Sequence, residues 1–377
     1  MAKKLIVLFG GMALVMMASA FSSAADGRWP VKQANDWYSQ QPWLIGSNFI
    51  PSTAVNELEM WQADTFDLPT IDRELGWAES LGMNTMRVFL HNLLWQEDSD
   101  GFLKRMDQFL TVADKHHIRI MFVLLDSVWD PNPHLGKQPP PRPHVHNSGW
   151  VQAPGAALLK DESRWNEELK PYVVGVISHF RDDKRVLIWD LMNEPDNDSP
   201  QYKTVELPNK AEVALRLLKQ EWEWARSAHP SQPLTSGVWK GNWSESKLSE
   251  MARFQLENSD VITFHCYDPP KKMKKRIRSL RRFHRPVICT EYMARPMGST
   301  FTAILPILKK NRVGAYNWGF VSGKSQTIYP WDSWEKTYTG EPSLWFHDIF
   351  RANGSPYDAK ETEFIRQMAR SGNRNES

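Results

Sequence analysis

Short apolar segments alternate with segments of helical periodicity along most of this 377-residue chain. Eight short runs are rich in β-branched or aromatic residues, which is typical of buried strands. Between them, apolar residues recur every three or four positions, as at Trp165, Leu169, Val173, Val176 and Phe180, and this spacing predicts amphipathic helices. The predicted strands are residues 43–49, 85–90, 119–125, 186–192, 234–239, 261–267, 287–292 and 315–321. The predicted helices are residues 70–81, 103–113, 165–180, 210–228, 244–257, 271–282, 300–310 and 359–368.

Eight alternating units with nearly continuous apolar strands predict an α/β fold, a (β/α)8 TIM barrel, rather than an open doubly wound sheet. No glycine-rich phosphate loop follows any predicted strand, which disfavours nucleotide binding. A barrel of this kind needs about 250 residues, so the remainder must lie mainly in long loops after the strands. The longest predicted loop spans residues 130–155 and has six prolines between Pro131 and Pro143.

The N-terminus has the features of a secretory signal peptide. Lys3 and Lys4 precede an apolar run at residues 5–17, and small residues at 18–20 and 23–25 offer cleavage sites. The apolar run is shorter than the roughly 20 residues of a transmembrane helix. We therefore expect a signal peptide at residues 1–25, one catalytic domain at residues 26–377, and a secreted or periplasmic product without stable membrane insertion.

The charge balance supplies no general attraction for polyanions. The chain has 46 Lys and Arg against 44 Asp and Glu, and without Lys3 and Lys4 the two numbers are equal. A neutral mature chain has no overall electrostatic reason to bind nucleic acid. We expect a monomer whose partner is a polysaccharide or oligosaccharide.

Two predicted strands end in a carboxylate. The strand at 186–192 runs into Asn193, Glu194 and Pro195, and the strand at 287–292 carries Glu291 near its end. Because active sites of barrels lie at the C-terminal ends of the strands, these two glutamates can converge across one pocket. Glycoside hydrolysis needs such a pair, with one carboxyl protonated and the other ionised.

In this context the chain resembles clan A glycoside hydrolases, and most of all glycoside hydrolase family 5, over residues 43–334. Family members are retaining enzymes on (β/α)8 barrels, with the acid/base on strand 4 and the nucleophile on strand 7. The Asn-Glu-Pro motif thus implies that Glu194 is the acid/base, and the second strand end implies that Glu291 is the nucleophile. A retaining pair predicts carboxyl groups about 5–5.5 Å apart. We expect no cofactor and no metal.

The same resemblance implies roles for further residues at strand ends. Arg87 matches the strand 2 arginine that steadies the nucleophile, and Asn193 would contact the 2-hydroxyl of the attacked sugar. His265 and Tyr267 match a His-x-Tyr pattern, in which the tyrosine bonds to the nucleophile. Trp318 matches the tryptophan that forms the floor of the sugar-binding subsite.

The end of the third strand departs from the family pattern, which commonly has a histidine there. This chain has Asp126 at that point, so either Asp126 takes the polar role or His91, beyond the second strand, fills the space. The departure leaves xylan, mannan and β-glucan equally favoured as substrates.

Charge and burial predict which of the two glutamates is protonated and which is ionised. Arg87 close to Glu291 would lower the pKa of Glu291, whereas burial and the negative charge of Glu291 would keep Glu194 protonated. Once the glycosyl ester has formed, the pKa of Glu194 should fall, so that it can act as a base toward water.

Tryptophan is abundant, with 18 residues, and several lie in predicted loops after strands. Some of these must pack the loops, while the others offer flat apolar faces to sugar rings. Their spread predicts an extended neutral chain bound in an open groove. The candidates are Trp61, Trp129, Trp150, Trp318, Trp331 and Trp334.

Three further features each have two interpretations. The nine Lys and Arg between Lys271 and Arg285 form either a solvated helix face or a patch for nucleic acid or an anionic glycan. His134, His144 and His146 lie in one loop, where a metal site is possible but lacks acidic or cysteine partners at ligand spacing. Cys266 and Cys289 lie on neighbouring predicted strands, and the alternation of side chains predicts two buried thiols rather than a disulfide.

Three function classes follow. The first is a secreted retaining β-glycoside hydrolase that cleaves a β-linked polysaccharide, with exo-action on short oligosaccharides as its variant. The second is a non-catalytic carbohydrate-binding barrel, which the intact glutamate pair disfavours. The third is a metal-dependent hydrolase on the same barrel, toward which His265 and Asp126 point.

Overall fold

A computed structural model describes residues 27–370, so the predicted signal peptide lies outside the described residues. Eight parallel strands stand in the order β5-β4-β3-β2-β1-β8-β7-β6, which confirms the predicted barrel. A parallel bridge between Val238, which follows β5, and Phe264 of β6 brings the ring close to closure. The strands are β1 (Ile45–Asn48), β2 (Thr85–Phe89), β3 (Arg119–Asp126), β4 (Val186–Asn193), β5 (Leu234–Thr235), β6 (Ile262–His265), β7 (Val287–Tyr292) and β8 (Gly314–Asn317).

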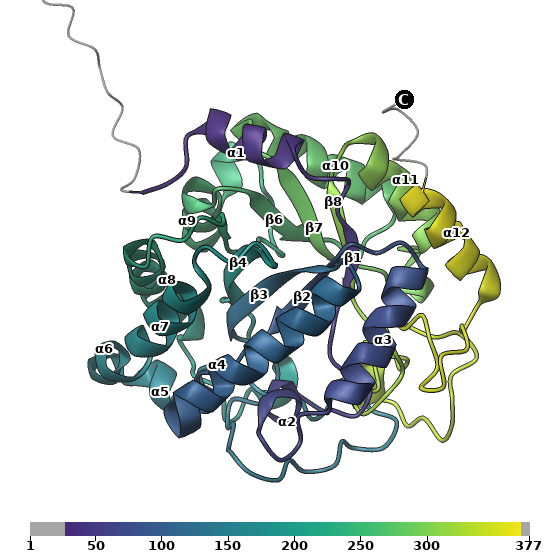
Figure 1. Ribbon diagram of the computed structural model, residues 1–377, viewed down its shortest axis with the longest axis horizontal. Coiled ribbons are helices and arrows are strands. Elements are labelled where there is room, and N and C mark those ends of the chain that lie inside the picture. The colour runs from purple at the N-terminus through teal and green to yellow at the C-terminus, as the bar shows by residue number, and fades with distance from the viewer. Residues whose placement is uncertain (1–26, 371–377) are drawn as a thin grey trace, which may run out of the picture.

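Helices surround these strands in a ring (Figure 1). None of the helices within residues 27–370 has the length and apolar character needed to cross a bilayer. The helices that precede β4 are α1 (Val31–Ser39), α2 (Glu57–Trp61), α3 (Leu68–Ser80), α4 (Asn92–Lys115), α5 (Ala156–Lys160), α6 (Trp165–Glu168) and α7 (Lys170–Phe180). Those that follow are α8 (Lys210–Ser227), α9 (Glu250–Asn258), α10 (Pro270–Leu280), α11 (Phe301–Lys310) and α12 (Ala359–Arg370).

The strands are buried on both faces, as the continuous apolar runs predict. Outside the ring, their side chains pack on the helices in one large core cluster. Inside the ring, a smaller cluster that includes Met121, Ile188 and Ile288 fills the N-terminal end of the barrel. Tyr38 of α1, a helix that the sequence pattern did not predict, belongs to this inner cluster. The N-terminal end of the barrel is therefore a packed core, and a functional site is expected at the opposite, C-terminal end of the strands.

Several predicted elements have other bounds in the structure, among them the fifth strand and the helix at 165–180. The fifth strand was predicted over residues 234–239, but β5 has only Leu234 and Thr235, and Val238 then forms an isolated bridge to Phe264. The long pattern at 165–180 is divided between α6 and α7, because Pro171 lies at the first turn of α7 and lacks an N–H to continue the preceding helix.

Candidate active site

The C-terminal ends of β2, β4, β6 and β7 bring the predicted polar residues to one point. Arg87, Asn193, His265 and Glu291 lie near the ends of these four strands, and all are buried. Glu194 follows directly after β4 with a left-handed φ of 42°. For a residue other than glycine this conformation is uncommon, and it aims the carboxyl group out of the line of the strand.

Arg87 is the hub of the hydrogen bonds in this cluster. Its Nη1 donates to Glu291 Oε1 and to Asn48 Oδ1, both at 2.9 Å. Its Nη2 donates to Asn193 Oδ1 at 2.8 Å, and its Nε donates to Asp190 Oδ2 at 3.0 Å. A fully buried guanidinium thus has two carboxylates, Asp190 and Glu291, to balance its charge.

The two strand-end glutamates meet at His265. Its Nδ1 lies 2.7 Å from Glu194 Oε1 and 3.5 Å from Glu291 Oε2. Tyr267 donates from its hydroxyl to Glu291 Oε2 at 2.6 Å, as the His-x-Tyr pattern implies. One carboxyl oxygen from each glutamate and the imidazole nitrogen all lie within 4.8 Å of one another. So close an approach of two oxygens favours the roughly 5–5.5 Å carboxyl spacing of a retaining pair over the roughly 6.5–9.5 Å of an inverting pair.

The neighbours of the two glutamates set their proton affinities. Burial raises the pKa of Glu194 to about 7, against a weaker opposing effect from the Asn197 amide, which donates to Glu194 Oε2 at 2.7 Å. Burial also raises the pKa of Glu291; the Arg87 guanidinium opposes this rise, as expected, but does not outweigh it. Glu291 has the direct guanidinium and phenol donors, and we therefore assign the ionised form to Glu291 and the proton to Glu194.

Asp126, at the end of β3, occupies the point where the sequence departs from the family pattern. Its Oδ1 accepts from Asn193 Nδ2 at 2.9 Å, and its Oδ2 accepts from Trp150 Nε1 at 2.7 Å. Burial raises the pKa of Asp126 to about 7. The carboxyl group therefore orients Asn193 toward the cleft and ties the long loop after β3 to the site.

His91 and Trp61 were predicted at the site, and the structure places both of them elsewhere. His91 accepts from the Leu93 N–H at 3.1 Å and caps the N-terminus of α4, while its Nε2 bonds to the Gln152 carbonyl at 3.0 Å. Trp61 is fully buried beneath the loops, where its Nε1 donates to the Phe89 carbonyl at 2.8 Å. From the sequence, a residue in the loop after strand 1 or strand 2 could equally line the active site or pack elsewhere. Only the packing of the folded chain shows that His91 and Trp61 do the latter.

A cleft of about 480 Å³ opens over Glu194 and Glu291. Trp129 and Trp318, both predicted at the site, line it. Trp239 and Asn197 also line it and were missed, although Trp239 ends the predicted fifth strand and its position was a usable signal. The Trp239 indole donates to Asp196 Oδ1 at 2.7 Å. Because Asp196 is only two residues after Glu194, this bond anchors the ring to the same loop. The aromatic lining of the cleft is Trp129, Trp150, Trp239, Tyr267, Trp318 and Trp331.

Loops after β3 and β8 join over one side of the barrel mouth. The Asn147 N–H donates to the Ser325 carbonyl at 2.8 Å. Trp129 stacks on Trp334 with ring centroids 5.2 Å apart and an interplanar angle of 10°. Since β1 and β2 lie between β3 and β8 in the ring, the joined loops cover the ends of those two strands.

The loop after β1 fills the space beneath this junction. Its Ser52 carbonyl accepts from the Lys324 N–H at 3.0 Å, and its Asn56 amide donates to the Gly149 carbonyl at 2.9 Å. Among residues 27–370, none before Asp126 lines the cleft. The cleft is therefore closed on the side of β1 and β2, and its lining comes from β3 to β8 and the loops that follow them.

The remaining sequence features occupy defined places. His144 and His146 bond through Nδ1 to the carbonyls of Tyr338 and Tyr329, both at 2.8 Å, so they join the loops after β3 and β8. Cys266 and Cys289 are buried and free, which confirms the prediction of two thiols.

The donors of Glu194, His265 and Glu291 converge closely enough to consider a metal ion. Hydrogen bonds already account for this geometry, because Arg87 and Tyr267 donate to Glu291 and the imidazole contacts Glu194 directly. Burial lowers the pKa of His265 to about 4, so the imidazole is neutral near pH 7. The net charge of the cluster is then set by Arg87 and the carboxyl groups alone.

Comparison with known proteins identifies the class. The family model described as cellulase (glycosyl hydrolase family 5) matches residues 77–323. The chain belongs to glycosyl hydrolase family 5 and is an O-glycosyl hydrolase. No curated protein sequence matches the chain.

Solved structures share the fold at low sequence identity. The endo-β-1,4-mannanase from Thermotoga petrophila is 16% identical, with a TM-score of 0.57 over 90% of this chain and 79% of the other. GH5_18 from Streptomyces cattleya, solved with GlcNAc, is 12% identical, with a TM-score of 0.57 over 89% and 81% of the two chains. The exo-β-1,4-mannosidase from Opitutaceae bacterium strain TAV5 is 19% identical, with a TM-score of 0.56 over 87% and 59%.

Proposed function

We propose that the protein is a secreted retaining β-glycoside hydrolase that acts on a β-linked polysaccharide or its fragments by double displacement. The observation that carries the proposal is the close approach of Glu194 and Glu291, with one oxygen of each within 4.8 Å. The signal-like N-terminus supports secretion. Among β-linked chains, the names of the mannanase and mannosidase neighbours support a mannan.

Each residue has a defined part in this reaction. Glu291 attacks the anomeric carbon while Glu194 protonates the departing oxygen, and a covalent glycosyl ester forms on Glu291. Arg87 and Tyr267 hold the Glu291 carboxylate in place before the attack. Formation of the ester removes the negative charge of Glu291, so the pKa of Glu194 falls and Glu194 takes a proton from the incoming water. Asn193, held by Arg87 and Asp126, is placed to bond to the 2-hydroxyl of the sugar.

An activated aryl β-glycoside and azide test the two roles. Glu291→Ala should lose nearly all turnover, and Glu194→Ala should lower turnover of an unactivated substrate by about 10²–10⁴-fold. With the activated substrate, azide should restore turnover of Glu194→Ala and yield a β-glycosyl azide, because azide attacks the ester without a base. An α-glycosyl azide from Glu291→Ala alone would exchange the two assignments.

The same assay separates the other function classes when it is run with a chelator. Turnover that survives chelation excludes a metal-dependent hydrolase, and turnover itself excludes a binding-only barrel. Absence of hydrolysis of any β-glycoside by the wild-type protein would overturn the proposal.

The closed side of the cleft favours a second candidate, cleavage at a chain end. The acid Glu194 protonates the leaving group, so the leaving part of the substrate lies toward the Glu194 side, beside Asn197 and Trp239. The attacked sugar then faces the wall made by Trp150 and Trp318 and the joined loops. We infer as this second candidate an enzyme that removes sugars from the non-reducing end, whereas the open groove expected from the tryptophans would suit cleavage within the chain.

Product sizing on β-mannan and on oligosaccharides of increasing length tests this mode of cleavage. An exo-acting enzyme should release the smallest product from the first time point, leave the viscosity of the polymer almost unchanged and reach full efficiency on short chains. A rapid loss of viscosity, with efficiency climbing over several sugar units, would instead establish endo-cleavage and leave the chemistry of the glutamate pair intact.

A further inference from the structure

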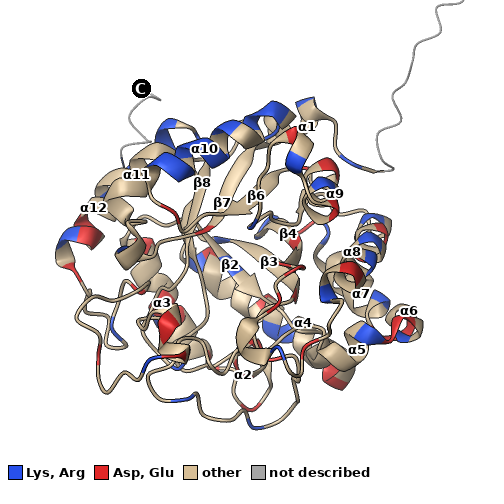
Figure 2. Ribbon diagram, turned by 180° about the vertical axis from the view of Figure 1, so that it is seen from behind, with Lys and Arg blue, Asp and Glu red and all other residues tan. Residues whose placement is uncertain are grey.

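Residues 269–331 carry almost only positive charge. The segment contains 14 Lys and Arg but only a single acidic residue, Glu291, although the whole chain is nearly balanced. Glu291 lies inside the barrel, paired with Arg87, so it cannot neutralise the outer surface. Figure 2 shows Lys and Arg along α10 and no Asp or Glu on that helix.

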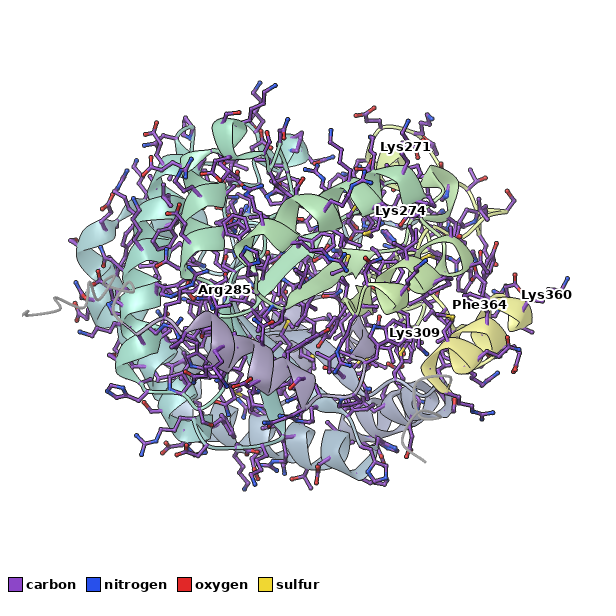
Figure 3. The ribbon with its side chains drawn as sticks, turned by 90° about the horizontal axis from the view of Figure 1, so that it is seen from above. Lys271, Lys274, Arg285, Lys309, Lys360 and Phe364 are labelled. Carbon is purple, nitrogen blue, oxygen red and sulfur yellow. The ribbon has the colours of Figure 1, made fainter. Side chains whose placement is uncertain are left out.

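The geometry of α10 gathers this charge on one face. Met273, Ile277 and Leu280 are buried against the barrel. The opposite face therefore presents Lys271, Lys274, Lys275 and Arg278, which are all exposed and recur at helical spacing. We call these four residues the α10 cationic face. Figure 3 shows Lys271 and Lys274 near one end of the helix and Arg285 beyond the other.

The basic residues beside this face are already engaged. Lys272 pairs with Asp268 at 2.9 Å, and Arg282 pairs with Glu245 at 3.3 Å. Arg276 donates to the Gly241 carbonyl at 2.6 Å and lies 4.0 Å from the centre of the Trp243 ring.

The α10 cationic face itself lacks such partners. Within residues 27–370, no carboxylate lies within 4.0 Å of the charged nitrogens of its four side chains. Like charges at helical spacing destabilise a helix slightly, and the folded chain does not offset that cost here. An external polyanion would offset it.

The position of α10 favours a sugar polymer over a lipid surface or a nucleic acid. The helix begins three residues after Tyr267, and Asp268 and Arg276 both line the catalytic cleft. A glycan chain that extends from the cleft past Asp268 and Arg276 therefore passes close to the first turns of α10. The helix also has no exposed apolar side chain to enter a bilayer, since its apolar residues are buried. A nearly neutral chain, in turn, lacks the broad positive field typical of nucleic-acid-binding proteins.

We propose that the α10 cationic face binds an acidic polysaccharide, such as a polyuronate, outside the catalytic cleft. The lysines act as point charges toward carboxylates that repeat along the glycan, and the contact holds the enzyme on a matrix in which neutral and acidic glycans are mixed. The site goes beyond the proposed function, because it does not depend on which β-linked sugar is cleaved.

Electrophoresis in gels containing polygalacturonate tests this proposal on the full chain. The test variant replaces all four residues, as Lys271→Gln, Lys274→Gln, Lys275→Gln and Arg278→Gln, since glutamine keeps helix propensity and removes charge. The matched control removes four exposed charges from the region of α4, α5 and α7, as Lys104→Gln, Lys160→Gln, Lys170→Gln and Lys184→Gln. Melting temperatures check that both variants are folded.

Polygalacturonate should retard the wild type and the control, and the test variant should bind about tenfold or more weakly. The slope of log affinity against log salt should become shallower by about 3, since roughly 0.7 ions are released per neutralised charge on a single strand. Uncharged galactomannan should retard all three proteins equally.

Equal retardation of the test variant and the control would overturn the proposal, as would no retardation of the wild type. Tighter α10-dependent binding to anionic vesicles or to duplex DNA would replace the glycan by that partner. Hydrolysis of aryl β-glycosides by the wild type is measured separately, so failure of the proposed function and failure of this inference are distinguishable.

Discussion

At the residue scale, two glutamates of the same type at similar strand ends differ through what donates to them. Glu291 receives the Arg87 guanidinium and the Tyr267 hydroxyl, whereas Glu194 receives the Asn197 amide and contacts a neutral imidazole. A full positive charge at 2.9 Å favours ionisation far more than an amide dipole does. This asymmetry assigns the proton to Glu194.

Asn197→Ala should shift the alkaline limb of the activity profile. The Asn197 amide stabilises ionised Glu194, so its removal should raise the pKa of Glu194 above about 7. Because Glu194 acts as an acid, activity falls as pH rises through this pKa, and the variant should keep activity to higher pH than the wild type. The profile of kcat/KM on an unactivated substrate measures the shift. A limb that stays in place would mean that a different group limits activity at high pH.

At the element scale, caps and loops decide which side chains reach the cleft. The alternation of strands and helices was predictable, since each element buries an apolar face that its own sequence encodes. The function of His91 was not predictable in this way. It stands at the end of β2, as a site residue would, but the start of α4 needs an N-cap acceptor, and His91 supplies it.

His91→Ala should lower the free energy of unfolding by about 1 kcal/mol, because the N-terminus of α4 loses its cap. His91→Asn, which restores a capping oxygen, should recover most of that loss. Urea denaturation measures both, and kcat/KM of the asparagine variant should stay close to that of the wild type, since His91 does not line the cleft. A large drop in kcat/KM with unchanged stability in both variants would place His91 in the active site.

At the scale of the whole molecule, the barrel buries several carboxyl groups beyond the catalytic pair. Burial raises the pKa of Glu74 and Asp126 to about 7 and that of Asp348 to about 6. Each of these groups binds its proton more tightly in the folded chain than in the unfolded chain. Stability from such groups is complete below their ordinary pKa, near 4.5 for a glutamate, and is lost as pH rises through the folded value.

The melting temperature should therefore fall as pH rises from about 5 to about 7.5. Glu74 lies in α3, remote from the cleft lining, and its oxygens accept from the Ser52 N–H and hydroxyl. Glu74→Gln keeps an oxygen for Ser52 and removes the titration, so its melting temperature should fall less over this range. A change of 1 kcal/mol corresponds to roughly 2 °C or less in a chain of this size. Thermal scans at a series of pH values measure the difference, and parallel curves would show that Glu74 does not contribute.

The sequence by itself determined the barrel, the strand-end glutamates and most of the residues that support them. These follow from short-range sequence patterns, because an apolar strand and the polar residue at its end are both encoded within a few positions. The family motifs add Arg87, Asn193 and Tyr267 by the same local reasoning, and the structure brings all three together.

Only the tertiary structure decided which loop residues face the cleft and where the cleft ends. Trp61 and Trp239 both follow strands, yet one is fully buried beneath the loops and the other lines the cleft. The closed side depends on contacts such as Asn147 with Ser325 and Trp129 with Trp334, which join parts of the chain far apart in sequence. The elevated pKa values depend on burial by all of these segments together. A local pattern states which way a side chain leaves its own element, whereas these properties arise from what other elements place against it.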